Sequence, residues 1–227
     1  MQRKTSEDIY DAKRWGLPVE AIGGLGDRLS RQWEQYRGCF KTRTRDSAKH
    51  AWTYLRGLLG MQMKRNYANI ARQVIDPEED GQNLQQFMSD SPWEAQAVIQ
   101  KVQQEIAETP GLQQGGMLLL DESADEKAGE KSAGAGPQHN GRLGKIAMSQ
   151  VGVFLAFYKD VVWTWVDGEL FLQEHWFTPK MASERKRVGV PEGRRFATKI
   201  ELGWRMIQRV QAQGLPFEGV ACDALYG

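Results

Sequence analysis

The spacing of hydrophobic residues changes half-way along this chain of 227 residues. Up to residue 112, apolar side chains such as Leu29, Trp33 and Tyr36 recur every three or four positions, which is the spacing of an amphipathic helix. The segments that follow this pattern are 29–40, 51–59, 66–74 and 82–89. Residues 28–112 are therefore predicted to form an all-helical region, preceded by a poorly ordered lead-in over residues 1–27.

One further helix in this region is predicted from its start signals. Ser91 can cap the helix, Pro92 fits its first position, and Glu94 stands three residues after the cap, as in a capping box. Pro110 and Gly111 are typical of the end of a helix. The helical half of the chain is then expected to close near residue 112.

After residue 112 the hydrophobic residues gather in short runs bounded by glycine and polar residues, which predicts β-strands. The predicted strands are 117–120, 145–158, 161–166 and 217–222, with a helix over 198–213. Asp160 and the triplet 167–169 (Asp-Gly-Glu) mark turns, and residues 122–144 form a polar, glycine-rich loop. A strand–helix–strand return usually makes a parallel pair with a right-handed crossover. Residues 113–227 are therefore predicted to hold a mixed sheet of the α+β or α/β class.

Two of the predicted strands deliver an aspartate at their end. Asp121 follows the run MLLL, and Asp223 follows the run GVAC. A parallel pairing of these strands would bring both carboxylates to one edge of the sheet. Hard divalent cations prefer oxygen ligands, and enzymes that transfer phosphoryl groups use such cations. The pair is therefore a candidate site for Mg²⁺ or Mn²⁺, although a single aspartate at a strand end is more often a turn residue.

The composition excludes several other classes of site. Cys39 and Cys222 lie far apart and the three histidines have no metal-ligand spacing, so neither a disulfide framework nor a zinc site is expected. The glycine-rich segment 129–144 lacks the spacing of a phosphate or dinucleotide loop, so no small-molecule cofactor is expected. There is no apolar signal segment and no run of about 18 apolar residues, so we expect no membrane contact and a cytoplasmic protein.

Positive charge is concentrated in the helical half, although the whole chain has a net charge of only +1. Eleven Lys or Arg residues but two acids, Glu34 and Asp46, lie between Arg28 and Arg72. This excess suits a polyanion such as double-stranded DNA, and a solvated helix surface explains it equally well. The segment 66–74 is the best candidate for a recognition helix. The candidate contacts to the DNA backbone are Arg37, Lys41, Arg43, Arg45, Lys49, Lys64, Arg65 and Arg72, with Lys131, Arg142 and Lys145 beside the glycine-rich loop.

Several longer stretches carry a family resemblance. They are NLQQFMSDSPWEAQAV (83–98), the stretch from LLLDES to GVFLA (118–156), ELFLQEHWF (169–177), VPEGRRFATKIELGWRMI (190–207) and VACDALYG (220–227). In these stretches the chain resembles bacterial insertion-sequence transposases of the DDE superfamily endonuclease type. The resemblance implies a ribonuclease H-like fold, a site for two divalent cations, and cleavage and transfer of DNA strands at the ends of a mobile element.

By the same resemblance, Asp121 and Asp223 are the first and second catalytic acids and metal ligands, and Glu122 is a weaker candidate. The third acid of the family, usually a glutamate on a later helix, would follow the second. Because the chain ends at Gly227, we expect a transposase truncated before its third acid and inactive alone. The apolar sheet face that truncation leaves open would favour self-association.

Three other interpretations remain open. A non-enzymatic DNA-binding protein would compete with an intact transposase for the ends of the element. A nuclease of the same fold would hydrolyse DNA without joining it, and would still need its full set of acids. A degenerate gene product would have no function.

Overall fold

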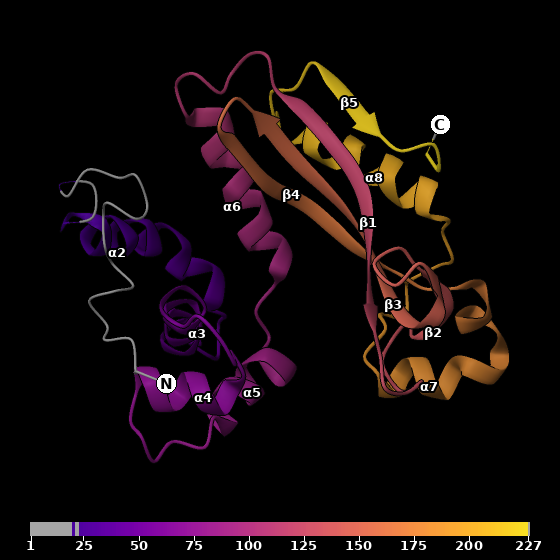
Figure 1. The fold of residues 1–227 in the computed structure, drawn as a ribbon, viewed down its shortest axis with the longest axis horizontal. Coiled ribbons are helices and arrows are strands. Elements are labelled where there is room, and N and C mark those ends of the chain that lie inside the picture. The colour runs from indigo at the N-terminus through magenta and orange to yellow at the C-terminus, as the bar shows by residue number, and fades with distance from the viewer. Residues whose placement is uncertain (1–19, 21–22, 227) are drawn as a thin grey trace. The chain divides into compact units, whose positions relative to one another are not determined.

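The computed structural model describes residue 20 and residues 23–226. Within it the chain divides into two compact units, Met1–Val98 (unit 1) and Ile99–Gly227 (unit 2) (Figure 1). Unit 1 is helical, and unit 2 combines a mixed sheet with helices, so the predicted α+β class is confirmed. Most of the predicted lead-in over residues 1–27 lies outside the described residues.

The helices of unit 1 follow the segments predicted from hydrophobic spacing. They are α2 (Leu25–Tyr36), the 3-10 helix η2 (Arg37–Phe40), α3 (Ala48–Gly60), α4 (Tyr67–Val74) and α5 (Gln82–Asp90). Ile70, Ala71 and Leu84 form a buried cluster in this unit, around which Tyr54 and other aromatic and aliphatic side chains pack. The short helix α4 and its neighbours therefore share one apolar centre.

The predicted start of the next helix is wrong. Helix α6 (Ala95–Glu108) begins four residues after Ser91, and Ser91 is itself extended, with ψ 136°, at the end of α5. The ring of Trp93 stacks on Phe87 with 5.6 Å between centroids, packs against Phe40 at 5.2 Å, and donates its Nε1 hydrogen to the Phe87 carbonyl. The packing of this half-buried aromatic ring stabilises more than a capping box does, so residues 91–94 stay outside the helix.

Unit 2 is built on a five-stranded sheet in which the long strand β3 pairs with three of the other strands (Figure 1). The strands are β1 (Met117–Glu126), β2 (Gly136–Asn140), β3 (Lys145–Lys159), β4 (Val162–Phe171) and β5 (Gly219–Cys222). β3 pairs antiparallel with β1, β2 and β4, while β1 pairs in parallel with β5 on its other edge. The helical elements between β4 and β5 are η3 (Glu174–Phe177), η4 (Pro179–Met181), α7 (Ala182–Arg187) and α8 (Lys199–Ala212).

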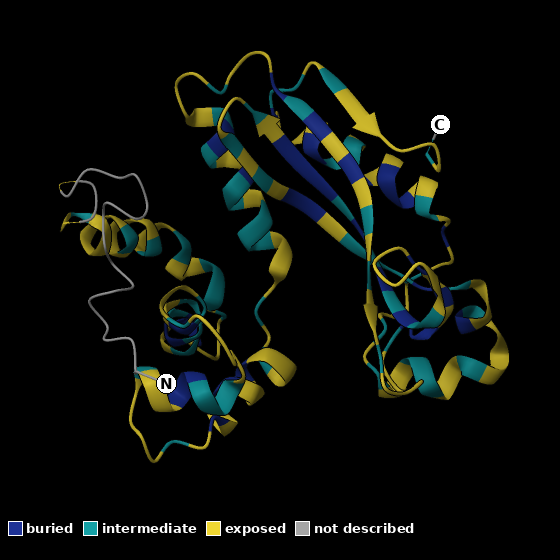
Figure 2. Ribbon diagram, in the orientation of Figure 1, coloured by how far each residue is buried: buried dark blue, intermediate teal, exposed yellow. Residues whose placement is uncertain are grey.

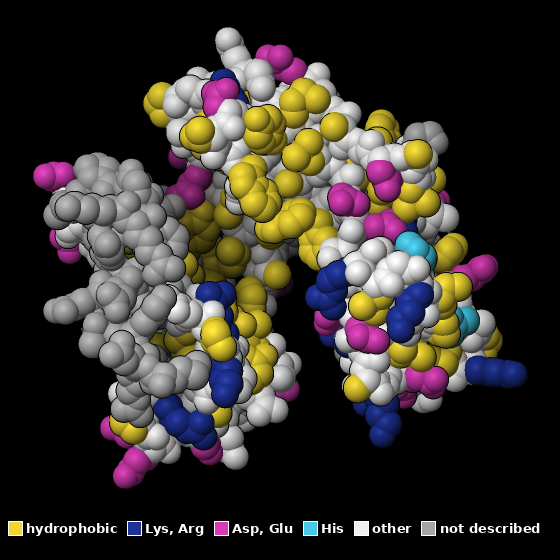
Figure 3. All heavy atoms as spheres, viewed as in Figure 1, with side chains coloured by type: hydrophobic (Ala, Val, Ile, Leu, Met, Phe, Trp, Pro, Cys, Tyr) yellow, Lys and Arg dark blue, Asp and Glu magenta, His cyan; other side chains and the backbone are white. Residues whose placement is uncertain are grey.

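One face of this sheet is buried against α8 and the other is open. Leu118 and Leu120 of β1 alternate with exposed neighbours and pack with Leu202, Met206 and Val210 of α8 in the main core cluster (Figure 2). On the other face, Trp163 is 65% exposed and Trp165 is 48% exposed. Figure 3 shows hydrophobic side chains gathered over β4 and β1, as expected for an uncovered apolar sheet face.

Two predicted loops of unit 2 are partly strand. β1 continues to Glu126, and β2 occupies residues 136–140, so the loop predicted over 122–144 is much shorter than expected. The turn predicted at residues 167–169 lies inside β4. There the pairing shifts from Leu155 with Asp167 to Ala156 with Trp165, which leaves Val166 as the extra residue of a β-bulge. Asp167 is only 2% exposed because it is ion-paired to Arg209 of α8, a contact that local sequence does not reveal.

Substitution of Gly57 tests the close packing of α3 on α4. A Cβ atom at this position would lie 2.3 Å from Ile70 Cγ2 and 3.0 Å from Ile70 Cβ. We expect Gly57→Ala to lower the free energy of unfolding by about 1–3 kcal/mol, because overpacking outweighs the gain in helix propensity. Gly60→Ala, in the same helix with nothing within 4 Å of its Cβ, should leave stability unchanged or higher. Urea denaturation followed by tryptophan fluorescence measures both, and equal stability of the two variants would contradict the packing argument.

Candidate active site

Asp121 projects from the open face of the sheet. Along β1, Leu118 and Leu120 are buried against α8 whereas Asp121 is exposed, because successive strand residues point to opposite faces. Asp121 was predicted at the end of its strand, but it lies in the middle of β1, opposite Phe154 of β3. Its backbone pairs with β3, and the residue before it, Leu120, also pairs with β5, which fixes the carboxylate more rigidly than a loop position would.

Asp223 follows β5 directly, and the strand register places it beside Asp121. The last pair of the parallel ladder joins Leu120 to Cys222, so Asp121 and Asp223 are the next residues of the two strands. Residues that correspond in this way point to the same face of a sheet. Both aspartates are exposed. The structure thus brings together the two acids that the sequence analysis singled out.

Each of these carboxylates uses one oxygen within the chain and leaves the other open. Asp121 Oδ1 accepts a hydrogen bond from the Glu122 amide at 2.7 Å, and Asp223 Oδ1 accepts one from the Leu225 amide at 2.9 Å. Among the described residues, Oδ2 of either aspartate has no hydrogen-bond or ion-pair partner. These two oxygens are available to a cation or to water.

Glu122 points to the other side of the sheet and is already paired. Its Oε1 atom lies 2.6 Å from Lys199 Nζ, and its Oε2 accepts a hydrogen bond from the Tyr226 hydroxyl at 3.1 Å. Burial raises the pKa of Tyr226 above its ordinary value, and the charges of Glu122, Asp223 and Asp121 raise the pKa further. All three carboxylates thus affect one tyrosine, but Glu122 already has two partners, Lys199 and Tyr226, which makes it the weaker candidate for a metal ligand.

The residues present suit one hard divalent cation better than two. Two exposed carboxylates supply part of an oxygen shell that water can complete, which suits Mg²⁺ or Mn²⁺. Among the residues that the structure describes, no group of three or more His, Cys, Asp or Glu side chains is arranged to hold a metal ion. The predicted two-cation site therefore lacks ligands within the described part of the chain.

A family model of the DDE superfamily endonuclease matches residues 35–227. The chain belongs to this family. It is 25% identical over 158 residues to the probable transposase for insertion sequence element IS701 of Microchaete diplosiphon. That alignment covers 66% of this chain and 36% of the relative, so the chain spans about a third of the relative's length. No solved structure matches the chain. Within residues 20 and 23–226, no helix is long and apolar enough to cross a membrane.

The basic residues of unit 1 that were predicted to contact DNA are exposed. Arg43 and Arg45 lie in the turn between η2 and α3. This turn is closed by hydrogen bonds between Thr42 and Arg45 and by a β-bridge between Lys41 and Asp46. Lys49 lies in the first turn of α3, Lys64 and Arg65 precede α4, and Arg72 lies on α4. Arg37 is 3.8 Å from Glu34, whereas Lys41, Arg43, Arg45 and Lys49 form no ion pair with any described residue.

The basic residues predicted in unit 2 are exposed as well. Arg142 and Lys145 flank the turn between β2 and β3, and Lys131 lies in the loop before β2. Arg142 also interacts with Asp125 of β1, whose pKa is lowered mainly by a hydrogen bond and ion pair with Lys127. Strand pairing therefore places a basic turn at one end of β3 and Asp121 further along β1, opposite Phe154 of β3.

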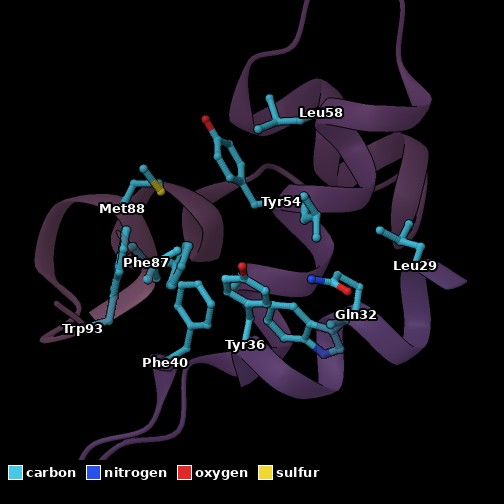
Figure 4. A pocket seen from close by; sticks show the side chains of 13 residues that line it. Leu29, Gln32, Tyr36, Phe40, Tyr54, Leu58, Phe87, Met88 and Trp93 are labelled. Atoms are coloured by element: carbon cyan, nitrogen blue, oxygen red, sulfur yellow. The ribbon is translucent and has the colours of Figure 1, made fainter. Parts of the chain in front are cut away.

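The apolar pocket of unit 1 is a different kind of site. It has a volume of about 430 Å³, and aromatic side chains from α2, α3, α5 and the segment before α6 line it (Figure 4). Trp33, Phe40, Phe87 and Trp93 are among these side chains, and no acid, histidine or cysteine is. The pocket therefore offers packing surface but no group for acid–base or metal chemistry, and the pair Asp121 and Asp223 remains the candidate active site.

Divalent-cation binding should depend on both aspartates. We expect Asp121→Asn and Asp223→Asn each to weaken Mn²⁺ binding by at least about tenfold, because each removes half of the carboxylate charge at the site. A titration of free Mn²⁺ followed by electron paramagnetic resonance measures the affinity. Asp160→Asn is the matched control, since Asp160 is exposed in the β3–β4 turn with φ 51°, which asparagine tolerates. Equal affinity in all four proteins would show that the cation does not bind between the aspartates.

Proposed function

We propose that this chain carries the first two catalytic acids of a transposase that cuts and joins DNA at the ends of a mobile element. The observation that carries the proposal is the strand register, in which Asp121 and Asp223 directly follow the last β1–β5 pair, together with the exposure of both residues. Membership of the DDE superfamily endonuclease family supports it, and so does the printed name of the relative, a probable transposase. An exposed pair of carboxylates is accessible to a DNA phosphate, as strand cleavage requires.

Asp121 and Asp223 would hold Mg²⁺ or Mn²⁺ through the oxygens that the chain leaves open. A bound cation of this kind activates water as a nucleophile and stabilises the charge on the leaving oxygen. The contribution of the chain is to fix the position of the two carboxylates. Asp121 is fixed by its pairing with Phe154 of β3, one residue after the last pair that joins β1 to β5, and Asp223 by the turn that its own side chain closes.

We infer that the chain needs at least one further acid for strand cleavage. Glu122, the neighbour of Asp121, is taken up by Lys199 and Tyr226. A site with two carboxylates is too weakly anionic to hold two metal ions close together. We therefore expect the 227-residue chain to be inactive alone, because too few free acids lie around Asp121.

The exposed basic residues of unit 1 favour a second function, binding of DNA without chemistry. Arg43 and Arg45 project from one turn and have no described ion-pair partner, so both are free to contact phosphates. A chain that binds element ends but cannot cut them would compete with an intact transposase. Self-association through the open sheet face around Trp163 would add to such competition.

A cleavage assay separates the two functions. Incubated with Mg²⁺ or Mn²⁺ and duplex DNA that contains the ends of the element, the full chain should give no nicked or joined product above background. The reason is that no third acid joins Asp121 and Asp223 in a metal-binding group among the residues that the structure describes. Cleavage that is lost in Asp121→Ala but kept in Asp160→Asn would contradict this expectation, and would show that a third acid is present within these 227 residues.

Salt dependence tests the DNA-binding surface. Four or five phosphate contacts from unit 1 would give a slope of about −4 in a plot of log affinity against log salt concentration. We expect the double variant Arg43→Ala/Arg45→Ala of the full chain to flatten this slope by about two and to weaken binding to all sequences alike. Lys180→Ala/Lys186→Ala, which removes two exposed charges from η4 and α7, is the matched control. An unchanged slope in the first variant would show that Arg43 and Arg45 are solvated and do not contact DNA.

A further inference from the structure

The position of Asp223 depends on a short element. β5 has four residues, most of them exposed, and among the described strands it pairs with β1 alone. Its start is tied to the residues before β1, because the Glu218 amide donates to Gly116 O at 2.7 Å and Glu218 Oε1 accepts from the Gly115 amide. Asp223 lies after the other end of this strand, beyond its last pair with β1.

Tyr226 supplies a tie at that end. Its amide donates to Asp223 O at 3.2 Å, which closes the turn, and its hydroxyl donates to Glu122 Oε2 at 3.1 Å. Its ring is half-buried and packs against the main core cluster of unit 2. The turn that carries Asp223 is thereby connected to β1 at the residue next to Asp121.

Lys199 holds the acceptor of this hydrogen bond in place. Its Nζ lies 2.6 Å from Glu122 Oε1, and the side chains of Lys199 and Glu122 are only 22% and 26% exposed. Lys199 is the first residue of α8, and its Nζ also lies 5.6 Å from the centre of the Phe171 ring. Glu122 is therefore held by Lys199 independently of Tyr226, so the bond can position the turn rather than merely follow it.

We propose that Tyr226 is a positioning residue of the candidate cation site, whose hydroxyl, bonded to Glu122, holds the Asp223 carboxylate beside that of Asp121. Tyr226 is not itself a ligand or a nucleophile, because its proton is engaged with Glu122 and because burial and the neighbouring carboxylates raise its pKa. The role in cation binding rests on the proposed function, whereas the role in fixing the turn does not.

Amide hydrogen exchange of the metal-free full chain tests the fixing of the turn. The Leu225 amide donates to Asp223 Oδ1, so its exchange rate reports whether the turn is closed. Tyr226→Phe keeps the ring in the core and removes the hydroxyl alone. We expect exchange at Leu225 and Tyr226 to become about tenfold faster, the size of a lost hydrogen bond to a charged acceptor. Tyr158→Phe, at an exposed tyrosine of β3, should change neither rate. Unchanged exchange in Tyr226→Phe would overturn the proposal.

Mn²⁺ titration with a double-mutant cycle tests the consequence for the site. We expect Tyr226→Phe to weaken Mn²⁺ binding by about five- to tenfold at an unchanged melting temperature, and to have no further effect in a Glu122→Ala background, because the hydroxyl acts through Glu122. An equal loss in both backgrounds would overturn the assigned route. If the wild-type chain binds no Mn²⁺ while exchange responds to Tyr226→Phe, the proposed function fails and the fixing of the turn by Tyr226 stands.

Discussion

The pairing of β1 on both of its edges is the constraint on which the rest of unit 2 depends. Ten residue pairs join β1 to β3, and four join it to β5 in parallel. Because strand residues alternate, a slip of one position would turn Asp121 into the core and Leu120 into solvent. Burial of Leu118 and Leu120 against α8 excludes that slip, so the hydrophobic core sets which face carries the acids. Gly203 of α8 allows this close approach, since a Cβ there would lie 2.6 Å from Leu120 Cδ2.

A partly buried group of charges connects β4 of the same sheet to α8. Arg209 Nε is 2.9 Å from Asp167 Oδ2, and its Nη1 is 2.6 Å from Glu169 Oε1. Burial opposes the charge on Arg209, but hydrogen bonds and attraction from these two acids outweigh it and raise the pKa of the guanidinium. The carbonyl of Val166, the extra residue of the bulge, accepts a hydrogen bond from the Gln103 side chain at 2.6 Å. Polar side chains from α6 and α8 thus satisfy the charges and the carbonyl of the irregular part of β4. Without these partners, burying the same groups would cost free energy.

Hydrophobic spacing alone predicted most of the elements, because α3 or β3 must bury one face whatever its neighbours are. The errors share a different cause. The capping signals at Ser91 were overruled by the packing of Trp93, and the turn signals at residues 167–169 by the ion pair with Arg209. The pairing of Glu122 with Lys199 and Tyr226 joins residues 77 and 104 positions apart, which no local pattern reports. Asp121 and Asp223 were recognisable because each follows a short apolar run, whereas Lys199 and Tyr226 gave no such signal.

The two acids of the candidate site are held by unequal means. Asp121 stands in the middle of a strand paired on both edges, so moving it requires breaking the sheet. Asp223 stands after a four-residue edge strand, and one turn and one tyrosine hydroxyl connect it to β1. A cation shared by both carboxylates gains affinity only if both are in place before it arrives, since ordering a ligand on binding costs free energy. In the proposed cation site, the less firmly held acid, Asp223, would therefore set the affinity, and changes of sequence near Asp223 would alter metal binding without disturbing the fold.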